Sequence, residues 1–146
     1  MADRFQLASA VLLEELAKPY REGSADCFML GCRVADALDP TLGLVARYGG
    51  RYTTLAGAQK ALRREGFKSL VDLHARHFPR IAPAQAQTGD LVIVSAPAIV
   101  VAGKPVRLVE HVAVCFYQRL IGKTERGRTD YDLEAAIAAF AVGRSA

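Results

Sequence analysis

Long apolar runs and targeting signals are missing from this sequence. Among the 146 residues no stretch approaches the roughly 18 continuous apolar residues of a membrane helix, and the longest candidate, 91–101, is broken by Pro97. The first four residues, MADR, lead into an amphipathic pattern instead of a continuous apolar segment. We therefore expect no secretory signal and no membrane insertion. A role outside the cytoplasm would need another delivery route, such as a phage particle.

Cysteine is scarce, and metal-binding spacings are missing. The three cysteines cannot all pair within one chain, so we expect free thiols, one of them kept for its reactivity. Cys27 and Cys32 lie five residues apart, while His74 and His77 have no second histidine pair to complete four ligands. These two histidines are expected to face solvent or a neighbouring loop. Because no glycine loop of the Walker type is present either, the sequence predicts neither a metal nor another cofactor.

A strong excess of one charge is also lacking. The net charge is +4, and the densest basic group is interrupted by Glu125 and expected on a solvated hairpin and loop: Arg119, Lys123, Arg126 and Arg128. Such a distribution does not favour a nucleic-acid partner. Hydrophobic residues make up 51% of the chain, which is enough for a packed interior, and no linker or repeat divides it. We expect one domain covering residues 1–146.

The first half of the chain has the periodicity of helices. Helices are predicted over 4–17, from Cys27 to about Leu38, from a cap at Thr53 or Thr54 to Gly66, and from a cap at Ser69 to a stop at Pro79. Residues 39–53 are expected to be irregular. Asp26 is the expected N-cap of the second helix, because its carboxylate can accept from the free N–H groups of the first turn.

After Gly89 the period changes to that of strands. Strands are predicted at 91–94, 99–101, 111–116 and 120–121, because these runs are β-branched or aromatic and separated by turn residues. A cap at Thr129 or Asp130 predicts a C-terminal helix over 131–142. Helices followed by an antiparallel sheet and a closing helix give an α+β fold.

Two residues have the character of a nucleophile and its base. Cys27 is expected in the first turn of a helix, where partial positive charge and free N–H groups favour a thiolate and can hold an oxyanion. Asp26 opposes this effect with its negative charge. His111 opens an apolar strand, where its ring would be held rigidly and remain accessible. The alternatives are a buried core cysteine and a polar residue at a strand edge.

Three short segments together resemble the NlpC family of papain-like cysteine peptidases. Segment 19–28 (PYREGSADCF) resembles the family's nucleophile segment, 89–92 (GDLV) its Gly-Asp-Leu strand opening, and 111–114 (HVAV) its His-Val-Gly-Ile strand. The order and spacing also agree over about residues 15–125. Features between 48 and 90 resemble a compact branch of the family that is common in phage and prophage tail gene clusters.

The resemblance implies a papain-like fold and a thiol hydrolase of the peptidoglycan stem peptide, typically cleaving between D-glutamate and a diamino acid. It makes Cys27 the nucleophile and His111 the general base, with Tyr20 lining the substrate cleft and Asp26 contacting the substrate amine. It also implies a virion tail location, or the bacterial cytoplasm before assembly, and tail or tail-tip proteins as partners.

One family feature has no clear match. The family has a polar residue on the strand after the base strand to orient the imidazole, whereas residues 120–124 read LIGKT. Thr124 or Gln118 could take that role, and a dyad without it would have weak activity. Two alternatives follow: a structural tail-tip component with a degenerate peptidase fold, and a cytoplasmic amidase acting on a γ-glutamyl amide.

Overall fold

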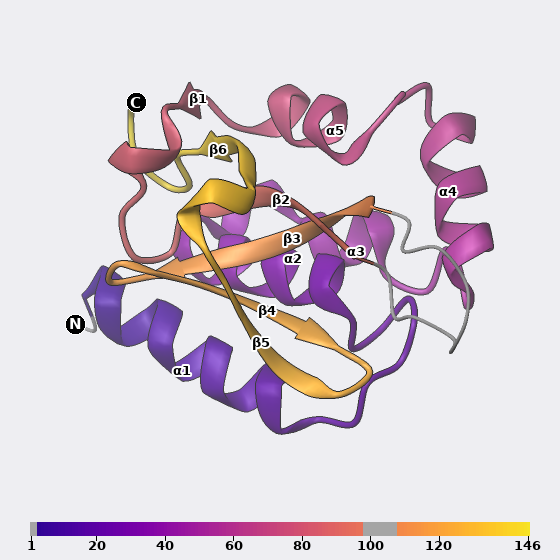
Figure 1. Ribbon diagram of the computed structural model, residues 1–146, viewed down its shortest axis with the longest axis horizontal. Helices are drawn as coiled ribbons and strands as arrows, with labels where there is room; N and C mark the ends of the chain where they lie inside the picture. Colours follow the sequence, from indigo (N-terminus) through magenta and orange to yellow (C-terminus); the bar gives the residue numbers. More distant parts are fainter. Residues whose placement is uncertain (1–2, 98–107) are drawn as a thin grey trace.

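The computed structural model describes residues 3–97 and 108–146, which form an α+β fold (Figure 1). The predicted strand at 99–101 lies outside the described residues. The helices come first: α1 (Arg4–Ala17), α2 (Cys27–Leu38), α3 (Leu44–Tyr48), α4 (Leu55–Arg64) and α5 (Leu70–His77), with the short 3-10 turn η1 (Pro40–Leu42) before α3. The first two helices have the predicted bounds, and Thr54 caps α4 through its hydroxyl as expected. Residues 39–53, predicted to be irregular, contain η1 and α3.

The strands make one antiparallel sheet in the order β1-β6-β2-β3-β4-β5 within the described residues. Their bounds, with those of two 3-10 turns, are β1 (Arg80–Ile81), η2 (Pro83–Gln85), β2 (Leu91–Pro97), β3 (Leu108–Phe116), β4 (Arg119–Thr124), β5 (Gly127–Tyr131), η3 (Leu133–Ala135) and β6 (Ala136–Phe140). The alternation of side chains along each strand gives the sheet two buried faces. One face packs on the helices through Val112 and Val114, and the other carries a smaller cluster that includes Ala113 and Cys115.

The predicted C-terminal helix over 131–142 is wrong. Tyr131 ends β5, and β6 inserts between β1 and β2, where residues 138–142 are fully buried. Small alanine side chains favour a helix in isolation, but here they allow close packing inside a sheet, so tertiary pairing overrides local propensity. Strand β5 was also missed, since the hairpin was expected to end in a loop.

The predicted solvent exposure of Lys123 and His74 is wrong as well. Lys123 is 2% exposed, and its ammonium donates a 2.6 Å hydrogen bond to the Glu15 carbonyl oxygen on α1. His74 is 2% exposed; its ring lies 5.8 Å from that of Phe140 on β6, and its Nδ1 bonds to the Leu70 carbonyl. Helix α1 covers Lys123 and strand β6 covers His74, and neither of these contacts was predicted from the sequence.

Asp90 fixes both ends of the described chain to the start of β2. Its carboxylate is fully buried and accepts from the N–H groups of Gln87 and Val142 at 2.8 and 3.0 Å. It also pairs with Arg4 of α1 at 2.7 Å and with Arg144 at 2.6 Å. The Gly-Asp segment at 89–90 therefore ties α1, β2 and the end of β6 together.

Candidate functional site

The start of α2 is held by the carboxylate of Asp26, which is 3% exposed. It accepts from the backbone N–H of Met29 as the N-cap and from that of Gly23 in the preceding loop, both at 2.8 Å. The hydroxyl of Tyr52 donates to the same carboxylate. The predicted cap is thus confirmed, and it fixes Cys27 as the first residue of the helix.

The Cys27 thiol is partly buried and lies against the edge of β3. The backbone N–H groups of Val112 and Phe28 lie close enough to the sulfur to favour its charged form and so lower its pKa. Burial, followed by the charge of Asp26, outweighs them and raises the pKa of the thiol to about 12. At neutral pH the resting protein therefore holds a protonated thiol.

In the described residues the regular pairing of β3 with β4 stops short of this point. It pairs with β4 only over Val114–Phe116, so the ladder ends before Val112. An added Cβ on Gly122 of β4 would lie 3.4 Å from the Val112 carbonyl oxygen, and a strand residue points its N–H to the same side as its C=O. The Val112 N–H that a continued β4 pairing would have used is thus available to the nearby Cys27 sulfur, whose pKa it lowers.

His111 comes from the same stretch of β3, one residue before Val112. Alternation along the strand directs its ring to the sheet face of Ala113 and Cys115, and it stacks on Tyr131 with the ring centroids 5.9 Å apart. Burial lowers the pKa of His111, while the nearby backbone carbonyls of Ala96 and Pro97 act in the opposite direction. In the described residues its Nε2 is buried without a hydrogen-bond partner, so no bond joins it to Cys27.

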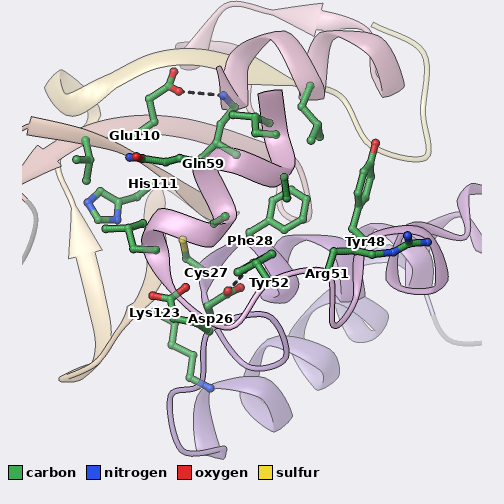
Figure 2. A pocket seen from close by; sticks show the side chains of 18 of the residues that line it. Asp26, Cys27, Phe28, Tyr48, Arg51, Tyr52, Gln59, Glu110, His111 and Lys123 are labelled. Atoms are coloured by element: carbon green, nitrogen blue, oxygen red, sulfur yellow. Dashed lines mark hydrogen bonds between the residues drawn. The ribbon is translucent and has the colours of Figure 1, made fainter. Parts of the chain in front are cut away.

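Cys27 and His111 line the same cavity, which has a volume of about 300 Å³ (Figure 2). The walls come from the loop before α2, from α4, and from the ends of β3 and β4. Apolar and aromatic side chains dominate, and the charged residues of the lining are more often acidic than basic: Glu22, Asp26, Glu65, Glu110 and Glu125 against Arg51, Arg64 and Lys123. A cavity of this size suits a short peptide or a small amide, with a nucleophile and a base in its wall.

The other predicted site residues divide into two groups. Tyr20, Asp26 and Thr124 line the cavity. The Tyr20 hydroxyl donates to Glu22 at 2.6 Å, within the loop before α2. Thr124 Oγ1 lies 3.2 Å from Thr129 Oγ1, within the β4–β5 hairpin, so both side chains already have a partner close by in the sequence.

Gln118 lies in the exposed turn that joins β3 to β4. It is seven residues beyond His111 along a hairpin that rises about 3.3 Å per residue, so it cannot orient the imidazole.

Three residues that were not predicted as site residues hold the elements of the site in place. Tyr52 locks Asp26, and Glu110 accepts from the Leu70 N–H at 2.9 Å and so joins α5 to β3. Tyr131 covers the His111 ring. Tyr52 lay in a segment that carried the family resemblance, whereas Tyr131 had no local signal because β5 was not predicted.

The described residues give no sign of a metal centre, a disulfide or a membrane helix. They contain no group of three or more His, Cys, Asp and Glu side chains that could hold a metal ion. Cys27, Cys32 and Cys115 are free thiols. No helix in the described ranges has the length and apolar character needed to cross a bilayer.

The fold and the site together define an α+β domain with a cysteine and a histidine in the wall of one cavity. The chain belongs to a family described as a domain of unknown function (DUF6950), whose model matches residues 2–142. No curated protein and no solved structure matches the chain.

Proposed function

We propose that this domain is a cysteine hydrolase of the NlpC type that cleaves the peptidoglycan stem peptide between D-glutamate and a diamino acid, and that it acts as part of a phage or prophage tail. The observation that carries the proposal is the cavity that Cys27 and His111 share, with two backbone N–H groups near the sulfur. These groups stabilise the negative charge that develops on sulfur as the thiol loses its proton.

The chemistry follows from the resting protonation states. Because the Cys27 thiol is protonated and the imidazole is neutral, His111 takes the thiol proton as the sulfur attacks the carbonyl carbon. The C–N bond then breaks, and the imidazolium gives its proton to the leaving amine. Water, deprotonated by the same imidazole, hydrolyses the thioester and restores the thiol. The hydrogen bond that this step needs between the imidazole and the thiol forms as the substrate enters the cavity.

The test is release of stem-peptide fragments from purified peptidoglycan under reducing conditions across a range of pH. We expect wild type to release fragments, Cys27→Ala and His111→Ala to release none, and the matched control Cys115→Ala to behave as wild type. Cys115 is a buried thiol that bonds the Tyr117 carbonyl and does not line the cavity. Absence of fragments with wild type at every pH would contradict the proposal, and hydrolysis of small γ-glutamyl amides instead would favour a cytoplasmic amidase.

A second candidate is a structural tail component that has kept the peptidase fold. It is favoured by the raised pKa of Cys27 and by the missing Cys27–His111 bond in the described residues. It predicts that particles with Cys27→Ala assemble and infect normally. A large loss of infectivity in normally assembled particles would support the hydrolase instead.

A further inference from the structure

Tyr131, the last residue of β5, reaches across β4 to the imidazole of His111. It pairs with Leu120, and its ring passes over Gly122, where an added Cβ would lie 2.6 Å from Tyr131 Cε2. The two rings are stacked, with centroids 5.9 Å apart and an interplanar angle of 28°. Any side chain at position 122 would force the tyrosine ring away, so the missing Cβ of Gly122 makes the stack possible.

Two polar atoms at this stack have no hydrogen-bond partner in the described structure. The Tyr131 hydroxyl and His111 Nε2 are both buried and unbonded. Burial raises the pKa of Tyr131 to about 12, with a smaller contribution from Cys27. Buried polar groups without partners cost folding free energy and are rare in native proteins, which sets this cluster apart from ordinary core packing.

We propose that Tyr131 is the positioning residue of His111 in the proposed hydrolase, its ring fixing the orientation of the imidazole next to Cys27. This inference rests on the proposed function. It assigns to an aromatic side chain of β5 the task that the family resemblance gives to a polar residue on the preceding strand. On that strand the structure has Gly122 under the ring, and Thr124 bonded to its own hairpin.

The stack, not the hydroxyl, performs the positioning. Tyr131→Phe keeps the ring and removes the unbonded hydroxyl, so it should leave His111 unchanged and raise the thermal unfolding midpoint. Tyr131→Leu removes the ring and opens the imidazole to water. Since burial is the main cause that lowers the His111 pKa, this variant should move that pKa upward toward its ordinary value. No charged side chain is among the causes that shift the pKa of His111, and the carboxylate of the adjacent Glu110 bonds the Leu70 N–H. The other titratable groups in the wall of the same cavity include Glu22, Asp26, Cys27, Lys123 and Glu125.

The test follows the His111 Cε1–H resonance by NMR as a function of pH, assigned by its loss in His111→Gln. We expect the same titration in wild type, Tyr131→Phe and the exposed control Tyr117→Phe, and an upward shift in Tyr131→Leu and Gly122→Ala. Gly122→Ala displaces the ring without changing Tyr131 itself, and it serves if Tyr131→Leu does not fold. An unchanged His111 titration in a folded ring-removing or ring-displacing variant overturns the proposal, even if that variant is less stable.

The NMR readout needs no substrate, so it separates the two proposals. If wild type cleaves no peptidoglycan while the titration shifts as expected, the hydrolase fails and the positioning stands. If wild type is active, Tyr131→Leu should lower kcat at least tenfold with little change in KM, and Tyr131→Phe should restore it. A ring-removing variant with wild-type kcat overturns the positioning role alone.

Discussion

The thiol of Cys27 should react slowly with a disulfide reagent in the resting protein. With a pKa of about 12 against about 8.5 for a free cysteine, the thiolate fraction at pH 7 falls roughly three-thousandfold. Each thiolate is more nucleophilic at the higher pKa, by roughly 25- to 50-fold for a Brønsted slope of about 0.4–0.5. The net expectation is a rate about a hundredfold below that of free cysteine.

Asp26→Asn should accelerate this reaction. The substitution removes the negative charge beside the thiol and keeps a side-chain oxygen for the Met29 N–H. The charge of Asp26 is the second cause that raises the Cys27 pKa, and removing a neighbouring like charge lowers a pKa by roughly one to two units. After the opposing change in nucleophilicity, we expect an increase of roughly three- to tenfold. Asp36→Asn is the matched control, because Asp36 lies on the same helix and bonds the N–H groups of Leu44 and Val45.

The assay is the reaction with 4,4′-dithiodipyridine between pH 6 and 11, with modification of each cysteine followed by mass spectrometry. For wild type the logarithm of the Cys27 rate should rise with pH up to about 11. A plateau below pH 8, or a rate above that of free cysteine, would refute the reasoning, since it would mean that the helix start and the two backbone N–H groups outweigh burial and Asp26. Equal reaction rates in Asp26→Asn and wild type would show that the charge of Asp26 does not raise the pKa of Cys27.

Three further predictions concern stability, each measured by urea unfolding. Asp90→Ala leaves the buried N–H of Val142, the partly buried N–H of Gln87 and two arginines without their carboxylate, so unfolding should cost about 3–5 kcal/mol less; a change below about 1 kcal/mol would contradict this. Burial lowers the pKa of His74 to about 4, so the unfolded chain binds a proton that the folded chain excludes. Stability is then full above pH 6.5 and should fall by about 3 kcal/mol as the pH drops to 4, whereas His74→Gln should flatten this dependence. Gly23→Ala should destabilise by at least about 2 kcal/mol, because Gly23 has φ +84° and its new Cβ would lie 1.9 Å from the Tyr52 carbonyl oxygen; an unchanged midpoint would show that the loop relaxes freely.

Helix starts and caps were predictable from the sequence because they depend on local chemistry. Asp26 and Thr54 act as caps through side chains that bond backbone N–H groups three residues on, so the signal and its effect lie within one turn. The same locality gave Cys27 its correct place at the start of α2. The site residues Cys27 and His111 line one cavity, as the resemblance implied, although their hydrogen bond is not made in the described residues.

The failures concern pairing over long sequence distances. The alanine-rich run of β6 has the local propensity of a helix, and only its neighbours β1 and β2 make it a strand. Tyr131 contributes to the site because β5 folds back along β4 and Gly122 has no side chain. Neither condition can be read from the residues around Tyr131, which explains why Gln118 and Thr124 were considered in its place.

The contacts of Asp90 bring residues 4, 142 and 144 to one point on the molecule. No residue of α1 or β6 is among those that line the described cavity. A change at Asp90 therefore loosens both ends of the described chain at once without touching a residue that lines the cavity. Stability and the chemistry of the cavity can thus be perturbed separately in this domain.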